Sequence, residues 1–192
     1  MDQKRKIRNS YLKKRGRMDC RTRKAADEEL FRKLKKHPDI ENAENIMVYY
    51  PIAAEADTLK IINYILEAKP GKKIWLPVIE GGNIRPARLK STKQVEKGEF
   101  GIPVPAGSRE FIDPPRLDLI IVPGVSFTSG GDRLGRGGGF YDRFLAKLKG
   151  RVKIMGLCYG RQLASRMPAG EKDIRVDEIV SSKYDRNKEE KN

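Results

Sequence analysis

The sequence predicts a single α/β domain with a mostly parallel sheet, on three observations. Short apolar runs alternate with segments whose apolar residues recur at helical spacing, which is typical of strands joined by crossover helices. The run 117–122 is almost continuously apolar, as expected for a central strand covered on both faces. The chain has 192 residues and no internal repeat or low-complexity linker, so 1–192 is treated as one domain.

Residues 1–40 form a basic N-terminal arm that is predicted to be helical. The arm carries fifteen Lys and Arg against six Asp and Glu, so it supplies +9 of the net charge of +15. Helical spacing predicts one helix through Met18 and a second from about Cys20 to Lys36, with the break at Gly16 or Asp19. The arm is either a solvated face with a few basic side chains directed at an internal ligand, or an RNA-binding arm.

The segment after the arm predicts a strand, a loop and a helix. Residues 45–50 are rich in β-branched and aromatic residues, as strands are. The loop 52–57 follows, and Asp57 or Thr58 would cap a helix whose apolar stripe is Leu59, Ile62, Ile65 and Leu66. Glu55 therefore lies between the carboxyl end of a strand and a helix N-terminus, where open α/β sheets bind ligands.

The middle of the chain predicts a hairpin and then irregular structure. Residues 73–79 should form a strand, and a turn at 81–83 should lead to an antiparallel edge partner at 84–89. The polar segment 90–98 is expected to be a loop. Residues 100–105 should be extended but not a central strand, because two of them are prolines.

Two more strands are expected near the C-terminus. Residues 153–159 are apolar enough for a buried strand, and the end of 173–180 fits a short one. The charged tail 181–192 is expected to fray.

The chain is organised around residues 130–143, which read GGDRLGRGGGFYDR. The order predicted here is strand, long glycine-rich loop and helix N-terminus, and the helix continues with Phe144 and Leu148. Glycines let a ligand approach the backbone, and arginine forks suit phosphate oxygens, so we expect an anion site. An acid in the first helical turn, Asp142, is well placed to hold Mg²⁺ beside a phosphate. The stretch matches neither the Walker pattern nor a good Rossmann fingerprint.

Composition limits the possible function classes. A net charge of +15 and a pI near 9.9 favour anionic ligands or partners. Cys20 and Cys158 are expected to be reduced thiols and not a zinc site. The single histidine, His37, is expected on the surface. No segment is apolar enough for a membrane span or a signal peptide, which predicts a cytoplasmic protein.

The sequence resembles the 5-formyltetrahydrofolate cyclo-ligase family, also called the 5,10-methenyltetrahydrofolate synthetases. The segments that carry the resemblance occur in the family's order and cover nearly the whole chain: KRKIR at 4–8, EADT at 55–58, FGIPVP at 100–105, GDRLGRGGGFYD at 131–142 and DIRVD at 173–177. The glycine motif with its trailing Tyr-Asp is the most specific of these.

The resemblance implies a three-layer α/β/α sandwich and an ATP-dependent C–N ligase activity. The implied substrate is 5-formyltetrahydrofolate, and the products are 5,10-methenyltetrahydrofolate, ADP and phosphate. ATP would phosphorylate the formyl oxygen, N10 would attack the activated carbon, and phosphate would leave as the ring closes. Phosphoryl transfer needs positioning and charge neutralisation more than a protein nucleophile. That agrees with a chain that lacks a convincing Ser, Cys or His constellation.

The resemblance also assigns roles by motif position. ATP contacts are implied at Lys4, Arg8, Gly131, Asp132, Arg133, Leu134, Gly135, Arg136, Gly137, Gly138 and Gly139. Folate contacts are implied at Tyr50, Glu55, Leu134, Gly135, Arg136, Gly137 and Gly138. Arg136 and Tyr141 are the expected catalytic residues, and Asp142 and Asp173 the expected Mg²⁺ ligands. The implied partners are ATP and 5-formyltetrahydrofolate, with no membrane and no obligatory nucleic acid, and a monomer is expected.

Three positions depart from the family's pattern. Gly138 stands where many relatives have lysine, Phe140 where a tyrosine is common, and Val104 where a polar residue is usual. Two alternatives therefore stay open. One is a basic RNA-binding protein that uses the arm, and the other is a nucleotide-binding relative without folate activity.

Overall fold

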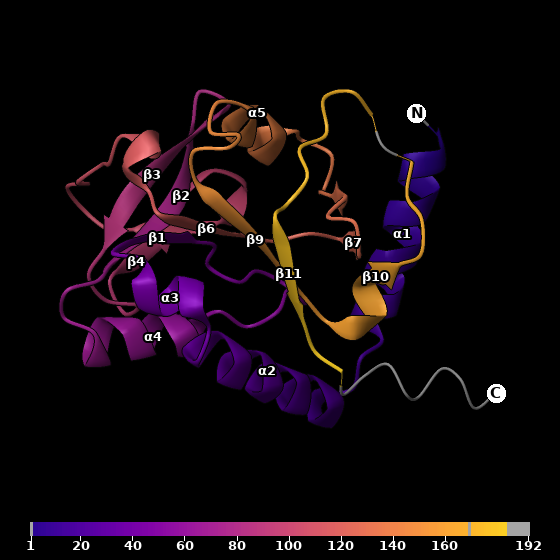
Figure 1. Cartoon of the computed structure of the whole chain (residues 1–192), viewed down its shortest axis with the longest axis horizontal. Helices are drawn as coiled ribbons and strands as arrows, with labels where there is room; N and C mark the ends of the chain where they lie inside the picture. Colours follow the sequence, from indigo (N-terminus) through magenta and orange to yellow (C-terminus); the bar gives the residue numbers. More distant parts are fainter. Residues whose placement is uncertain (1, 169, 184–192) are drawn as a thin grey trace.

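The computed structural model of the chain describes residues 2–168 and 170–183. Its centre is a six-stranded sheet in the order β11-β9-β6-β1-β2-β3, which is parallel except for β3 at one edge (Figure 1). The strands are β1 (Asn45–Val48), β2 (Lys73–Glu80), β3 (Asn83–Leu89), β6 (Leu119–Val122), β9 (Lys153–Cys158) and β11 (Glu178–Ser181). The predicted α/β class and the antiparallel edge at 84–89 are confirmed.

Helices cover both faces of the sheet and give the three expected layers. The helices α2 (Cys20–Lys35), α3 (Pro38–Asn42) and α4 (Leu59–Ala68) pack on one face, and α5 (Phe140–Ala146) packs on the other. Side chains alternate along a strand. Leu119 and Ile121 of β6 therefore pack with α2 and α4, whereas Ile120 and Val122 pack with α5.

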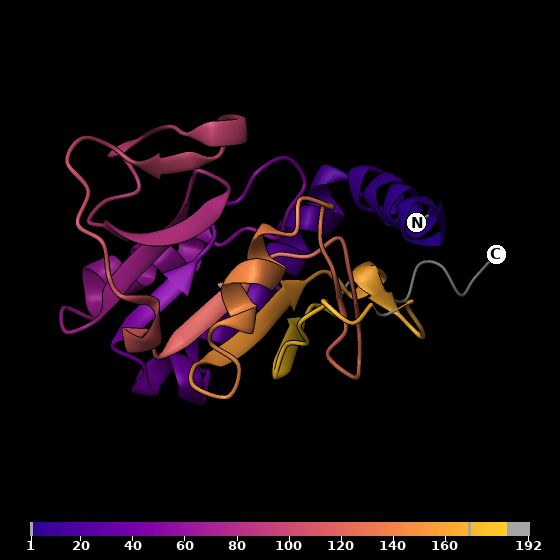
Figure 2. The same cartoon turned by 90° about the horizontal axis from the view of Figure 1, so that it is seen from above.

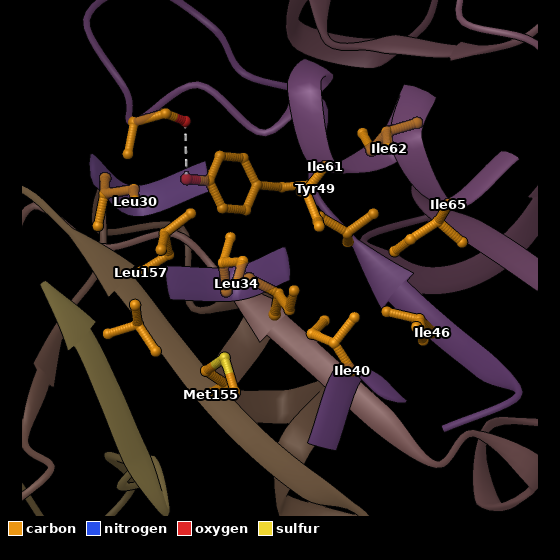
Figure 3. Packing of buried hydrophobic residues seen from close by; sticks show 14 of the residues in the cluster. Leu30, Leu34, Ile40, Ile46, Tyr49, Ile61, Ile62, Ile65, Met155 and Leu157 are labelled. Atoms are coloured by element: carbon orange, nitrogen blue, oxygen red, sulfur yellow. Dashed lines mark hydrogen bonds between the residues drawn. The ribbon is translucent and has the colours of Figure 1, made fainter. Parts of the chain in front are cut away.

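The larger core lies between the sheet and the helices α2, α3 and α4. Figure 3 shows side chains from these helices meeting those of the strands, among them Leu30, Leu34, Ile40, Ile61, Ile65, Ile46, Met155 and Leu157. Leu30 and Leu34 are fully buried, and burial of one such side chain stabilises the fold by about 1.5–3 kcal/mol. This face of the sheet therefore anchors α2, which also carries polar side chains toward the loop after β1.

Capping side chains define where the helices begin. The helix α1 (Asp2–Gly16) ends at Gly16, and α2 begins after Asp19, whose Oδ1 accepts the Thr22 N–H at 2.9 Å. At α4, the N-cap residue Thr58 donates its hydroxyl to the Tyr49 carbonyl at 2.7 Å, while Asp57 Oδ1 accepts the Leu59 N–H at 2.8 Å. Asp57 and Thr58, the two residues expected to cap α4, thus both form hydrogen bonds at the start of this helix.

Two small sheets were not predicted. The strand β4 (Val95–Lys97) pairs with β5 (Pro103–Pro105), and the short η1 (Glu99–Gly101) lies at their tip. The expected loop at 90–98 is therefore wrong for its last part.

The remaining small strands and turns are β7 (Ser126–Thr128), β8 (Arg133–Leu134), β10 (Leu163–Ala164), η2 (Pro114–Arg116) and η3 (Gly160–Gln162). The β7–β8 hairpin interrupts what the sequence predicts as one continuous glycine-rich loop.

His37 is not the surface residue that the sequence predicts. Its side chain is only 15% exposed. Nδ1 accepts the Asp39 N–H at 3.2 Å and so caps α3, which leaves Nε2 to donate to Glu178 Oε1 at 3.0 Å. His37 thus ties α3 to β11, a link between distant segments that the sequence does not reveal.

Other expectations have simpler outcomes. Both cysteines are free thiols. In the part of the chain that the structure describes, every helix is too short or too polar to cross a membrane. The expected frayed tail begins at Ser181, which ends β11, and its residues 184–192 lie outside the described residues.

Candidate active site

A pocket of about 730 Å³ opens at the carboxyl ends of β1 and β6. From β1 the chain proceeds to β2 and β3 on one side, and β6, β9 and β11 lie on the other, so the strand order reverses between β1 and β6. This reversal is where open α/β sheets bind ligands. Tyr49 and Tyr50, just after β1, line the pocket, and so do Pro123, Gly124 and Val125, just after β6.

The two ends of the pocket differ in chemistry. Helix α1 supplies Lys4 and Arg8 at one end. At the other end, β2, β3 and the β4–β5 hairpin region supply apolar side chains, namely Pro77, Ile79, Ile84 and Ile102. Figure 2 shows α1 and the β4–β5 hairpin at opposite ends of the molecule with α5 between them. The site can therefore hold an anionic group and an apolar group at once.

The loop after β1 presents Glu55 to the pocket. Its side chain is only 8% exposed, and Arg136 lies against it, with Nε and Nη2 at 3.2 and 3.1 Å from Oε1. The other oxygen, Oε2, accepts the Ile52 N–H at 3.2 Å. A carboxylate fixed in this way keeps a defined direction for accepting hydrogen bonds from a ligand.

Helix α1 contacts the glycine-rich stretch and the segment near Asp173. The Lys4 ammonium pairs with the Asp173 carboxylate. Arg8 Nε donates to the Gly135 carbonyl at 2.9 Å. A Cβ at Gly137, which has φ 110°, would lie 3.4 Å from Arg8 Cζ. That distance is an ordinary contact, so the positive φ, and not the arginine, is what favours glycine at this position.

Arg133 and Asp142 form a largely enclosed pair at the pocket wall. The Arg133 side chain is 2% exposed, and its Nη2 donates to Asp142 Oδ1 at 2.7 Å. The guanidinium also lies 5.5 Å from the Tyr141 ring centroid. Such a pair fixes both side chains, because a buried charge is stable only when it is compensated.

Tyr141 lines the pocket, and its hydroxyl oxygen is buried and finds no hydrogen-bond partner among the described residues. Burial raises the pKa of Tyr141 well above its usual value, and the nearby Glu55 raises it further. The hydroxyl therefore stays protonated at working pH and is available as a hydrogen-bond donor.

Most of the residues implied by the resemblance line this one pocket. They are Lys4, Arg8, Tyr50, Glu55, Arg133, Leu134, Gly135, Arg136, Gly137, Gly138, Gly139, Tyr141, Asp142 and Asp173. Gly131 and Asp132 do not line it. Asp132 instead accepts hydrogen bonds from Thr128 and from Arg175, at 2.8 and 2.7 Å, and a Cβ at Gly131 would lie 2.4 Å from the Val176 carbonyl oxygen. These two residues shape the β7–β8 turn.

The helix that follows the glycine-rich stretch is short. Helix α5 has only seven residues, and its N-cap Gly139 takes φ 66° without a side-chain cap. Fewer than two turns align few peptide dipoles. The cations for an anionic ligand therefore come from α1 and the loop, through Lys4, Arg8 and Arg136.

Two departures from the family's pattern are linked in space. A Cβ on Gly138 would lie 2.6 Å from the Phe140 ring, so this ring occupies the room that a side chain at 138 would need. Phe140 in turn packs against Phe100 of η1, with 5.5 Å between ring centroids. The absence of a lysine at 138 and the presence of phenylalanine at 140 are thus parts of one local packing arrangement.

Two carboxylates in the pocket have the chemistry of a Mg²⁺ site. Asp142 and Asp173 both line it, and the N–H of Ile174, the residue after Asp173, lies 3.5 Å from Asp142 Oδ1. Mg²⁺ prefers oxygen ligands and is usually held by one or two carboxylates together with phosphates. The two acids fit that description, although each is paired with a basic side chain, Arg133 or Lys4.

A second group of possible ligand atoms lies outside the pocket. Atoms of His37, Asp39 and Glu178 lie within 4.8 Å of one another. The Lys153 ammonium lies 3.8 Å from Asp39 and 3.5 Å from Glu178, so it already offsets their charge. This group ties α3, β9 and β11 together.

Sequence reasoning missed several lining residues. The apolar wall, with Pro77, Ile79, Ile84 and Ile102, reads in the sequence as ordinary strand or extended residues. Tyr49 and the segment 123–125 could have been found, because they follow predicted parallel strands directly. Arg143 joins the wall by donating to the Gly138 and Gly82 carbonyls at 3.0 and 2.9 Å.

Comparisons with known proteins agree with this arrangement. The model of the 5-formyltetrahydrofolate cyclo-ligase family matches residues 1–182. The 5-formyltetrahydrofolate cyclo-ligase of Escherichia coli is 30% identical over 76% of this chain and 81% of its own length. The mitochondrial 5-formyltetrahydrofolate cyclo-ligase of Arabidopsis thaliana is 29% identical over 93% of this chain and 74% of its own length.

Solved structures lead to the same family. The 5,10-methenyltetrahydrofolate synthetase of Aquifex aeolicus superimposes with a TM-score of 0.82 at 34% identity, over 94% of this chain and 90% of that one. The Mycoplasma pneumoniae enzyme of that name shares the fold, with a TM-score of 0.74 at 22% identity over 94% and 98% of the two chains. With a family match over nearly its whole length, the chain belongs to the 5-formyltetrahydrofolate cyclo-ligase family.

Proposed function

We propose that the protein converts 5-formyltetrahydrofolate to 5,10-methenyltetrahydrofolate with the hydrolysis of ATP to ADP and phosphate. The observation that carries the proposal is the pocket at the strand-order reversal, which joins a cationic end to an apolar end. The nucleotide's phosphates suit the end with Lys4 and Arg8. The flat folate rings suit the apolar end, with Tyr50 and Glu55 between the two ends.

The proposed reaction does not use a nucleophilic side chain of the protein. The γ-phosphoryl group passes to the formyl oxygen, and the N10 nitrogen of the folate then attacks the formyl carbon. N10 loses its proton as the new C–N bond forms, and the formyl oxygen leaves with phosphate. The protein has to position the reactants and neutralise the transferred charge.

Each pocket residue has a role in this proposal. Lys4 and Arg8, with the backbone of 135–139, hold phosphate oxygens, and Glu55 accepts hydrogen bonds from the pterin ring. Arg136 lies beside Glu55 and is 48% exposed, so it is free to turn toward a transferred phosphoryl group. Tyr141 donates its unpartnered hydroxyl to developing negative charge.

Asp142 and Asp173 are the residues that would hold Mg²⁺. The ion, when bound, neutralises phosphate charge during transfer. We also propose that the protein acts in the cytoplasm and as a monomer.

The RNA-binding alternative finds less support. Two of the arm's basic side chains, Lys4 and Arg8, face the pocket. Base stacking needs aromatic side chains, and Tyr11 is the one aromatic residue of α1, with the Lys14 ammonium 5.5 Å from its ring centroid. A nucleotide-binding relative without folate activity is separated by the experiment below.

The test is to mix the purified protein with 5-formyltetrahydrofolate and Mg-ATP and to follow the ultraviolet absorbance of the methenyl product. We expect an ATP-dependent rise, and none when either substrate is left out. ATP binding without product would indicate the nucleotide-binding relative. Neither product nor ATP binding, together with salt-sensitive binding of RNA, would favour the RNA-binding alternative.

A further inference from the structure

The loop that carries Glu55 has a strained backbone. Ala53 takes φ 51°, a left-handed conformation that costs a residue with a Cβ free energy. The turn is closed by hydrogen bonds between Ile52 and Glu55, from the Glu55 N–H to the Ile52 carbonyl and from the Ile52 N–H to Glu55 Oε2, both at 3.2 Å. Such strain persists only where surrounding contacts impose the conformation.

A buried polar pair outside the pocket supplies these contacts. Asp27 lies on α2, and Tyr159 directly follows β9, 132 residues later. The Tyr159 hydroxyl lies 2.7 Å from Asp27 Oδ1 and 3.2 Å from the Glu55 carbonyl oxygen. Asp27 Oδ1 also accepts the Asp57 N–H at 3.0 Å. The pair therefore contacts the backbone on both sides of Ala56.

Neither residue is placed where it could touch a ligand. Tyr159 is fully buried, Asp27 is nearly so, and neither lines the pocket. A buried carboxylate and a buried hydroxyl are costly to enclose unless their hydrogen bonds are made. Packing alone would be satisfied by two apolar side chains of the same shape. A polar pair that contacts the backbone of one loop holds that loop in one orientation.

We propose that Asp27 and Tyr159 are positioning residues for Glu55, and that they set the substrate contact made by its carboxylate. The proposal rests on the assignment of the folate substrate to this pocket. It predicts that loss of the Tyr159 hydroxyl weakens folate binding, while Lys4, Arg8 and the backbone of 135–139, which hold ATP, remain unaffected. A residue with only a structural role would change stability and leave the two substrates equally affected.

Tyr159→Phe tests this with the whole chain. We expect the KM for 5-formyltetrahydrofolate to rise about three- to tenfold, the effect of losing one hydrogen bond, with kcat and the KM for ATP unchanged. Amide hydrogen exchange should become faster in a peptide covering 52–58 and stay unchanged in the other segments. The matched control is Thr22→Val, which removes a buried hydroxyl from the same helix α2, bonded to Asp19 at 2.6 Å, without touching the loop.

A double variant tests whether Tyr159 affects folate binding through Glu55. In a Glu55→Gln background, Tyr159→Phe should add no further rise in the folate KM, because coupled residues are not additive. Asp27→Asn should retain near-normal folate KM, since the amide oxygen still accepts both hydrogen bonds, whereas Asp27→Leu should not.

The outcomes distinguish this proposal from the assigned function. The wild-type protein could form no methenyl product while Tyr159→Phe still speeds amide exchange only in 52–58. In that case the substrate assignment fails, but the claim that Asp27 and Tyr159 hold the loop is supported. Unchanged exchange in 52–58, or an undiminished Tyr159→Phe effect in the Glu55→Gln background, would overturn the positioning role.

Discussion

The Lys4 ammonium of α1 and the Asp173 carboxylate form an ion pair at the cationic end of the pocket. Burial alone would raise the pKa of Asp173, but hydrogen bonds from Lys4 and from the Gly170 N–H outweigh it, and the pKa is lowered. Asp173 is thus ionised without any metal. Since Lys4 and Asp173 are the proposed ligands of phosphate and Mg²⁺, binding of Mg-ATP requires both to exchange partners.

Asp173→Asn should therefore strengthen the binding of metal-free ATP while weakening the response to Mg²⁺. Lys4 loses its charged partner in this variant, and we expect its contact with phosphate to improve affinity for metal-free ATP by about three- to tenfold. Isothermal titration with and without Mg²⁺ measures both effects. Equal weakening under the two conditions would mean that Lys4 and Asp173 do not compete in this way.

Asp142→Asn should lower both activity and stability. Product formation should fall about 100-fold or more, as when one preorganised group that stabilises transition-state charge is removed. Arg133 stays buried and keeps only a neutral acceptor, which should lower the free energy of unfolding by about 1–3 kcal/mol. Thermal melts measure stability and the absorbance assay measures product.

The control for Asp142→Asn is Glu80→Gln, which makes the same chemical change in an exposed pair with Arg85. Exposed pairs contribute little, so its unfolding free energy should stay within about 1 kcal/mol of the wild type. Equal losses in the two variants would show that enclosure of Arg133 has no special effect.

Tyr141→Phe should reduce kcat by about two- to tenfold, the value of one hydrogen bond, and by the same factor at every pH. The reason is that burial raises the pKa of Tyr141 far above the working range, so the hydroxyl only donates. The measurement is the pH profile of kcat for both proteins. A limb of the profile that disappears in Tyr141→Phe would show instead that this hydroxyl titrates.

Asp27→Asn should stabilise the fold at neutral pH. Burial raises the pKa of Asp27, and the hydrogen bonds from Asp57 and Tyr159 only partly oppose this. An acid with a raised folded-state pKa favours the fold below its unfolded pKa, and that contribution is lost as pH rises through the folded pKa. The melting temperature of Asp27→Asn minus that of the wild type should therefore grow as pH rises from acid toward neutral. A difference that shrinks over this range would contradict the sign.

Local patterns in the sequence predicted most of the strands and helices, and their alternation predicted the fold class. Most of the charged residues of the pocket were indicated by the resemblance to the family, through its motifs. What the sequence could not predict depends on distant partners. The sequence does not show that Arg133, which lines the pocket, pairs with Asp142. It also does not show that His37, which was expected on the surface, bonds to Glu178.

Local sequence patterns also did not predict the apolar end of the pocket. Pro77, Ile79 and Ile84 are strand residues like any others until the β4–β5 hairpin is placed over them, and the strands of that hairpin are too short to show an alternating pattern. The helix α5 also ends at Ala146, before Leu148, so it is shorter than its apolar spacing suggests.

The packing of α1 against segments much later in the chain determines the order in which the parts of the pocket can form. Its contacts Lys4–Asp173 and Arg8–Gly135 join residues that lie 169 and 127 positions apart in the chain. On the ribosome, the core around α2, α3, α4, β1 and β2 can gather early, whereas the partners of α1 at Gly135, in η3 and at Asp173 emerge only later. The cationic end of the pocket is therefore assembled after this core, and a chain cut off before Gly135 lacks all of these contacts to α1.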